Sequence, residues 1–443
     1  VPSTVFPRLD ALADSSYTHQ YYVNGSPRAS DAYLGASWKT LLVGAPGGGG
    51  RSVFALDITS PTAFSESNVL WEFTSDGDQD LGYVLGQPTI ARMNDDSWVA
   101  LVGNGYNSAN NRAMLFIINL ADGTLLKKID TGVGSALSPN GLSAPVPVDI
   151  DGDKITDTVY AGDLHGNLWK FDLSATNNGS WDIAYKASGS GSPTPAPLFT
   201  AVDAGGTAQA ITVRPAVGLH PKGGIMVYFG TGKFFEVGDN IVPLNPPVNS
   251  FYGIRDEGVK ISGRGVLQAQ TIQNELYGVS FGSNVFDVRV VSDNTIDYST
   301  QKGWYLDLQS PVNGAEGERV VVDPLLRNGR MIFSTLIPSA DTCGFGGTGW
   351  LMEVDAVNGA RFSFSVFDLD GDGLFDDGDF VTLDDGSKVP VSGQNFREII
   401  SQPVVIDAGE REFKYISGSS GNIQTVDEKG DSSKGRQSWR QIR

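Results

Sequence analysis

The sequence is poor in cysteine and histidine, and it contains no long hydrophobic run. The single cysteine, Cys343, cannot form an internal disulfide, so the fold does not depend on disulfides. Three histidines leave little room for a histidine-rich metal site. No apolar run approaches the roughly 18 residues needed to span a bilayer. The chain begins Val1-Pro2-Ser3 without a signal-peptide pattern, so we expect a soluble piece of a larger protein.

Basic residues are also scarce relative to acidic ones. The 51 Asp and Glu residues outnumber the 32 Lys and Arg residues, which gives a formal net charge of −19. Such a surface repels nucleic-acid phosphates and anionic lipid headgroups and attracts divalent cations. We therefore expect no nucleic-acid partner and no direct membrane insertion.

Glycine and proline are abundant. The 55 glycines and 22 prolines, with only 19% charged residues, are typical of many short strands joined by tight turns. Hydrophobic residues make up 40% of the chain, enough to build a folded core. The composition predicts an all-β protein.

A short strand motif recurs along the chain. Each copy has alternating apolar residues, often aromatic, and ends near an Asp or Asn that leads into a turn. Seven segments fit this description: 53–57, 115–119, 167–172, 251–256, 303–307, 350–355 and 422–427.

The spacing of the copies indicates the architecture. Repeats of roughly 40–50 residues are typical of propeller blades, and longer intervals indicate inserted loops. The longest interval, from Asp172 to Asp256, contains Pro-rich segments at 189–197 and 243–247. We predict a single seven-bladed β-propeller domain over residues 1–443, with inserted loops. An irregular array of β-sandwich sheets is the alternative that this pattern leaves open.

The strongest chemical motif is the Asp-rich loop at residues 368–376. Carboxylates at its first, third and fifth positions and glycine at the sixth match the front of a calcium loop, because Ca²⁺ prefers 6–8 oxygen ligands. Leu374 would add its backbone carbonyl, and Asp376 would close the site, with Asp379 as the alternative closing residue. The predicted ligands are Asp368, Asp370, Asp372, Leu374 and Asp376.

A second loop at residues 149–157 has the same pattern. Lys154 stands where a calcium loop prefers glycine, which predicts backbone strain and weaker binding than in the 368 loop. The predicted ligands are Asp149, Asp151, Asp153, Ile155 and Asp157. A third acidic cluster, Asp76–Asp80, lacks a closing carboxylate and is predicted to be a turn. The sequence thus predicts two Ca²⁺ ions, with the 149 loop regulatory and the 368 loop mainly structural.

Several segments resemble a known family. The 149 loop leads into Tyr160-Ala161-Gly162-Asp163-Leu164-His165-Gly166-Asn167-Leu168-Trp169, which is similar to a hallmark segment of the PilC/PilY type IV pilus biogenesis proteins. Other segments that resemble this family run from about Tyr21 to Trp439 and include 87–93, 214–218, 228–232, 323–326, 333–338 and 343–353.

This resemblance implies the C-terminal, modified, quinoprotein-like propeller of such a protein, without its N-terminal region. It also implies calcium binding at the 149 loop, which would govern pilus extension and retraction. The expected role is non-enzymatic and lies in pilus assembly, adhesion and twitching motility. The expected location is the pilus tip, outer membrane or cell surface of an exported protein. The expected partners are minor pilins, through the rest of the protein, and a host-surface receptor.

Three other functions are less compatible with the sequence. A quinoprotein-like dehydrogenase would share the propeller repeat, but a single cysteine excludes the vicinal disulfide that often accompanies the quinone. A hydrolase would need a Gly-x-Ser-x-Gly elbow or a paired-carboxylate site, and the acidic spacing here matches metal loops instead. A glycan-binding propeller has no signature in this sequence. We therefore predict no catalytic and no organic-cofactor residues.

Overall fold

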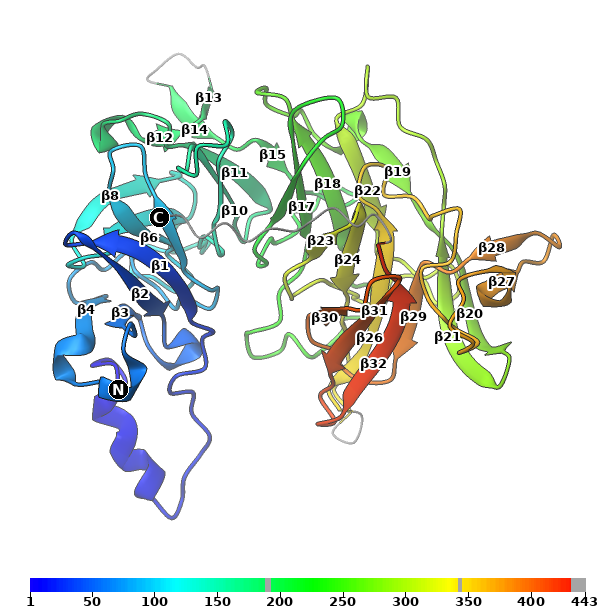
Figure 1. The fold of residues 1–443 in the computed structure, drawn as a ribbon, viewed down its shortest axis with the longest axis horizontal. Helices are drawn as coiled ribbons and strands as arrows, with labels where there is room; N and C mark the ends of the chain where they lie inside the picture. Colours follow the sequence, from blue (N-terminus) through cyan, green and yellow to red (C-terminus); the bar gives the residue numbers. More distant parts are fainter. Residues whose placement is uncertain (188–192, 342–344, 432–443) are drawn as a thin grey trace. The chain divides into compact units, whose positions relative to one another are not determined.

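The computed structural model describes residues 1–187, 193–341 and 345–431 (Figure 1). The chain forms two compact units. Unit 1 comprises Val1–Gly232 with Arg255–Val266, and unit 2 comprises Lys233–Ile254 with the chain from Leu267 onward. The described elements are β-strands and short 3₁₀ helices, which confirms the all-β prediction. No helix in this described part is long and apolar enough to cross a membrane.

Unit 1 is built from successive antiparallel meanders. Its first two sheets have four strands each and its third has five, with strands that neighbour in sequence also pairing in space. The first sheet contains β1 (Arg28–Leu34), β2 (Ser37–Gly44), β3 (Ser52–Asp57) and β4 (Val69–Thr74). The second contains β5 (Thr89–Arg92), β6 (Trp98–Gly103), β7 (Met114–Asn119) and β8 (Leu125–Asp130). The third contains β9 (Val146–Val148), β10 (Thr158–Gly162), β11 (Asn167–Asp172), β12 (Asp182–Ile183) and β15 (Phe199–Thr200).

Strand β7 shows how these sheets stack. Leu115 and Ile117 belong to a core shared with Trp169 and Phe171 of the third sheet. The alternate residues Phe116 and Ile118 belong to a different core, shared with the first sheet. Because successive side chains of a strand point to opposite faces, one strand supplies both cores. This explains why β7 is apolar at every position from Met114 to Ile118 rather than at every second one.

The buried Asn104 fixes the start of β7. Its Oδ1 accepts hydrogen bonds from the backbone N–H groups of Met114 and Leu142, at 3.0 and 3.1 Å. Its Nδ2 donates to the carbonyl oxygens of Asp80 and Arg112, both at 2.8 Å. All four hydrogen-bonding positions of the amide are used, so this polar side chain is buried without an unsatisfied group.

Unit 2 contains both antiparallel and parallel strand pairs. Strand β22 (Gly303–Asp307) pairs with β18 (Ser250–Asp256) and with β19 (Gln268–Gln270). A seven-stranded sheet contains β20 (Ile272–Phe281), β21 (Asn284–Val291), β29 (Gly393–Phe396), β26 (Gly347–Asp355), β24 (Arg330–Ser334), β23 (Leu325–Arg327) and β25 (Ile337–Pro338). A three-stranded sheet contains β30 (Val404–Asp407), β31 (Arg411–Ser417) and β32 (Ile423–Lys429).

The prediction of seven blades is wrong. All seven predicted strand copies are strands, but the copies at 251–256 and 303–307 lie in β18 and β22, which are antiparallel neighbours in one sheet. Counting sheets with four or more strands gives five in the described chain. The repeat therefore marks individual strands rather than one strand per blade. The single domain over residues 1–443 and the quinoprotein-like character stay predictions.

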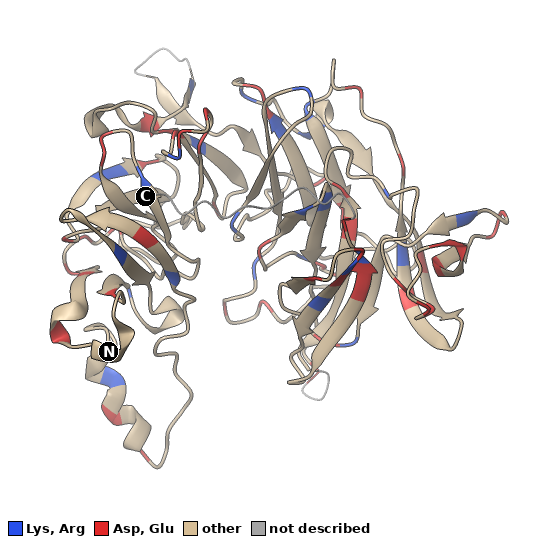
Figure 2. Ribbon diagram, viewed as in Figure 1, with Lys and Arg blue, Asp and Glu red and all other residues tan. Residues whose placement is uncertain are grey.

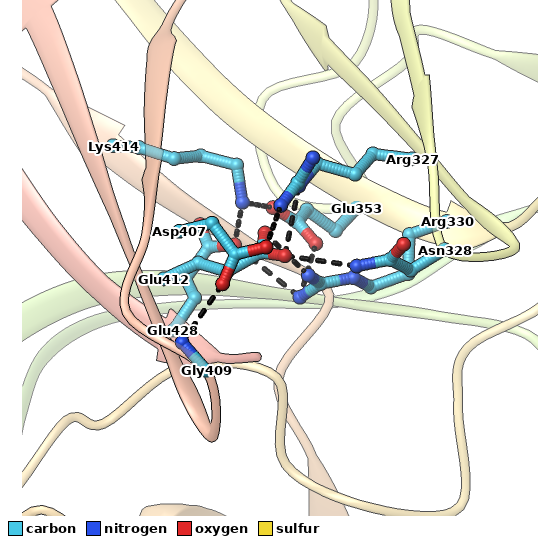
Figure 3. A network of polar contacts seen from close by, with 9 residues as sticks. All are labelled: Arg327, Asn328, Arg330, Glu353, Asp407, Gly409, Glu412, Lys414 and Glu428. Atoms are coloured by element: carbon cyan, nitrogen blue, oxygen red, sulfur yellow. Dashed lines mark hydrogen bonds and ion pairs between the residues drawn. The ribbon is translucent and has the colours of Figure 1, made fainter. Parts of the chain in front are cut away.

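Unit 2 also buries charged side chains. Figure 2 shows acidic and basic residues close together on its strands. Figure 3 shows the densest group, in which Arg330 Nη2 lies 2.9 Å from Glu412 Oε2, and Lys414 forms close ion pairs with Glu353 and Glu428. These five side chains are 4% exposed or less. The network connects β24 and β26 with β31 and β32.

Candidate metal centres

The first Asp-rich loop lies in unit 1 between β9 and β10. Asp149, Asp151 and Asp153 are exposed, and each places a carboxylate oxygen within 4.8 Å of the others. Two of the turns need a left-handed backbone: φ is +87° at Gly152 and +71° at Lys154. A non-glycine residue is disfavoured in that region, so the predicted strain at Lys154 is present.

The second loop lies in unit 2, between residue 367 and the 3₁₀ helix η7 (Asp377–Asp379). Asp368, Asp370 and Asp372 likewise place carboxylate oxygens within 4.8 Å of one another, and the first two are partly buried. The left-handed positions are here both glycine, with φ of +80° at Gly371 and +82° at Gly373. The loop therefore adopts its turns without the strain seen at Lys154.

The two loops share one hydrogen-bond pattern. In both, the first Asp accepts from the backbone N–H groups of the fourth and sixth residues, at 2.7 and 2.7 Å in the first loop and 2.9 and 3.0 Å in the second. In both, the third position accepts from the fifth and the fifth accepts from the seventh. These bonds curl each loop so that its alternate carboxylates converge.

The closing carboxylates differ in position. In the first loop, Asp157 Oδ2 accepts from the N–H of Ile150, the second residue, at 2.9 Å. In the second loop, the equivalent bond from the N–H of Leu369 goes to Asp379 Oδ1 at 2.6 Å. Asp376 Oδ1 instead accepts from the N–H of Gly378 at 2.8 Å, as the N-cap of η7. The structure thus gives Asp379, the alternative closing residue, the place that Asp157 has in the first loop.

Burial sets the electrostatics of Asp379. Its residue is 1% exposed, and this burial raises the pKa of its carboxyl to about 6, with the carboxylates of Asp370 and Asp368 adding to the rise. Hydrogen bonds from the N–H groups of Leu369 and Asp370 act in the opposite direction. A buried carboxylate beside two others is the arrangement that a bound cation stabilises most.

Sequence reasoning missed Asn94, which holds the closing residue of the first loop. Its Nδ2 lies 3.3 Å from Asp157 Oδ1 and donates to the carbonyl oxygens of Thr156 and Leu173, at 3.1 and 3.3 Å. Asn94 follows β5, a strand of the neighbouring sheet, so only the fold brings it to the loop. The carbonyls of Ile155 and Leu374 stay predicted ligands.

The third acidic cluster behaves as the sequence predicts. Residues 75–77 and 79–80 form turns, and the ammonium of Lys128 lies 2.8 Å from Asp78 Oδ2 and 2.7 Å from Asp80 Oδ2. Asn110 Nδ2 donates to Asp80 Oδ1 at 2.6 Å. Lys128 thus pairs with two of the three carboxylates of this cluster.

Comparison with known proteins identifies the family. The family model described as the PilY1 β-propeller domain matches residues 1–280. A type IV pilus biogenesis factor PilY1 homolog of Xylella fastidiosa is 38% identical over the whole of this chain, which covers 31% of that relative. The chain belongs to the PilY1 β-propeller family.

Other relatives agree with this assignment. PilY1 of Pseudomonas aeruginosa is 36% identical over the whole chain, which covers 39% of it, so the chain spans about a third of the length of these curated relatives. The crystal structure of the P. aeruginosa PilY1 C-terminal domain matches with a TM-score of 0.80 and 32% identity. That match covers 96% of this chain and 87% of the other. It confirms the predicted β-propeller and the predicted PilC/PilY family.

Proposed function

We propose that this chain is a calcium-binding, non-enzymatic domain of a type IV pilus biogenesis factor. The observation that carries the calcium assignment is the hydrogen-bond pattern shared by the two Asp-rich loops, which lie in different units and have little else in common. The pilus assignment is supported by membership of the PilY1 β-propeller family.

The residues present fit a hard divalent cation. Each loop offers three convergent carboxylates and a fourth from its closing residue, and oxygen-rich loops of this kind suit Ca²⁺. Mg²⁺ should compete poorly, because it prefers small octahedral shells that keep several waters. The ligands proposed for the first loop are Asp149, Asp151, Asp153, Asp157 and the carbonyl of Ile155. Those for the second are Asp368, Asp370, Asp372, Asp379 and the carbonyl of Leu374.

In the cell, the domain would act in an exported protein at the pilus tip, outer membrane or cell surface. Its proposed roles are in pilus extension and retraction, adhesion and twitching motility, with minor pilins and a host-surface receptor as partners. The net charge of −19 supports partners that are neither nucleic acid nor anionic membrane. Of the two loops, the exposed 149 loop is the proposed regulatory site.

The test combines calorimetry with a motility assay. Ca²⁺ is titrated into the wild-type chain and into two loop variants, Asp151→Asn with Asp153→Asn, and Asp370→Asn with Asp372→Asn. We expect two binding events in the wild type and one in each variant, with Mg²⁺ giving much weaker heats. The first variant should also alter twitching when placed in the full-length protein. Unchanged binding in both variants, or a bound quinone seen in an absorbance scan, would contradict the proposal.

A further inference from the structure

An arginine lies beside the first carboxylate of the 368 loop. Arg411, the first residue of β31, has its Nη2 atom 3.4 Å from Asp368 Oδ2. The same guanidinium forms a close ion pair with Asp427 of β32, and its Nε donates to Asp427 Oδ1 at 3.1 Å. Its Cζ also lies 5.5 Å from the centre of the Phe413 ring. Three neighbours therefore fix a positive charge at the edge of the proposed calcium site.

The loop sequence leaves room for this guanidinium. A Cβ atom added to Gly373 would lie 2.8 Å from Arg411 Nη1, closer than such atoms approach. Gly373 is thus favoured by its φ of +82°, and any larger residue there would also have to shift the end of the Arg411 side chain. The equivalent residue of the first loop is Lys154, and in the described part of the chain no ion pair involves Asp149. Arg411 is therefore specific to the 368 loop.

We infer that Arg411 is an internal competitor cation that sets the calcium affinity of the 368 loop. This inference rests on the proposed function of that loop. Asp368 Oδ2 already accepts from the N–H of Gly373 at 3.0 Å and lies next to the guanidinium. A Ca²⁺ ion held by the first three carboxylates would lie close to this positive charge and be repelled by it. A Ca²⁺ ion must either displace the guanidinium or bind despite its repulsion. In either case the Ca²⁺ affinity of the loop is lower.

Arg411 has the opposite effect on the metal-free loop. Its charge offsets the mutual repulsion of the clustered carboxylates, so it keeps the loop folded when calcium is absent. Removing the charge should therefore weaken the metal-free state and tighten calcium binding together. A residue with a purely structural role would instead weaken both, which makes the sign of the affinity change diagnostic.

The exchange of cations also has a structural consequence. Arg411 directly precedes Glu412, and Lys414 follows on the same strand, both within the buried ion network. Calcium binding at the 368 loop is thereby coupled to the start of β31. The two states are the loop with Arg411 paired to Asp368 and the loop with Arg411 released. Calcium shifts the equilibrium between them only because it binds the two states with different affinity.

Calorimetry on matched variants tests this inference. All variants carry Asp151→Asn and Asp153→Asn, so that only the 368 loop reports Ca²⁺ binding. In Arg411→Gln we expect the Kd for Ca²⁺ to fall about tenfold, since removing a unit charge near a divalent ion changes binding by that order. Arg411→Lys, with its single shorter point charge, should lower the Kd by about threefold. The control Arg397→Gln removes an exposed arginine with only a 3.8 Å ion pair and should leave the Kd unchanged.

Melting temperatures give a second measurement. Without calcium, Arg411→Gln should melt below its parent, and saturating Ca²⁺ should raise its melting temperature by more than it raises the parent's. An unchanged or weaker Ca²⁺ affinity in both Arg411→Gln and Arg411→Lys would overturn the inference. A parent that binds no Ca²⁺ at this loop would instead contradict the proposed function itself, so the two failures are distinguishable.

Discussion

The two Asp-rich loops have the same curl but different supports. The 149 loop is exposed, carries a strained Lys154 and is closed by Asp157, which Asn94 holds from a neighbouring sheet. The 368 loop is partly buried and is closed three residues later, at Asp379. The backbone pattern needs only the local sequence, whereas the strength of each site depends on residues brought by the fold. One motif can therefore serve two purposes in one chain.

The largest effect on stability should come from a substitution in the buried ion network of unit 2. In Arg330→Met, three buried glutamates keep only Lys414 and the partly exposed Arg327 as cationic partners, and breaking such a pair costs about 3–5 kcal/mol. Urea unfolding should show this loss for unit 2, together with weaker Ca²⁺ binding at the 368 loop only. The control Arg397→Met removes an exposed arginine that lies 3.8 Å from Asp287 and should cost less than about 1 kcal/mol. Equally weakened Ca²⁺ binding at both loops would contradict this difference between them.

The free energy of unfolding should depend on pH through Lys414 of the same buried ion network. Burial lowers the pKa of Lys414 from 10.5 to about 8, partly opposed by Glu353. Between pH 8 and 10.5 the unfolded chain then binds more protons at this residue than the folded chain, so the free energy of unfolding should rise with pH, by up to about 3 kcal/mol. Urea midpoints across this range, compared with those of Lys414→Met, check the effect. If the free energy of unfolding of Lys414→Met had the same pH dependence as that of the wild type, groups other than Lys414 would cause it.

The closing residue of the 368 loop can be tested with a matched pair. Asp379→Asn removes the carboxylate equivalent to Asp157. It should raise the Kd for Ca²⁺ by tenfold or more, and tenfold corresponds to about 1.4 kcal/mol of binding free energy. Asp376→Asn leaves that carboxylate in place and should change the Kd by less than about threefold. Calorimetry in a background without the first loop compares the two. The reverse order would restore Asp376 as the ligand and make the two loops more alike.

The smallest effect concerns the strained lysine. Lys154→Gly should stabilise the metal-free protein by about 1 kcal/mol, because glycine adopts a φ of +71° without a steric penalty. It should also tighten Ca²⁺ binding at the 149 loop by removing a positive charge. The reciprocal change, Gly373→Lys, should destabilise the 368 loop further, since the new side chain would also meet Arg411. Thermal melting with and without Ca²⁺ measures both.

What the sequence could predict follows from the range of the interactions. The carboxylate positions of both loops are local, and their spacing was enough to predict that Asp149, Asp151 and Asp153, and Asp368, Asp370 and Asp372, would converge. Asn94 and Arg411 are separated from their partners by 63 and 43 residues, so no local pattern could reveal them. Asp379 is the twelfth residue of its loop, where a standard calcium loop closes, but the shorter spacing of the 149 loop favours Asp376 from the sequence alone.

The blade count failed for a related reason. The alternating apolar residues identify each strand copy, but the tertiary fold decides which strands pair. The copies in β18 and β22 read alike, and they pair with each other in one sheet. A repeat can therefore establish the fold class while giving the wrong number of sheets.

Strand β7 has a consequence for how the chain finds its fold. A strand with one polar face resists a one-residue slip, because slipping would bury its polar side chains. Strand β7 has no polar face between Met114 and Ile118, so after a slip it would still bury only apolar groups, although in the wrong cores. The amide of Asn104 removes this ambiguity, since its Oδ1 is met by the N–H of Met114 in one register only. Asn104 therefore acts as a register marker, and its loss should show first as slow or heterogeneous refolding.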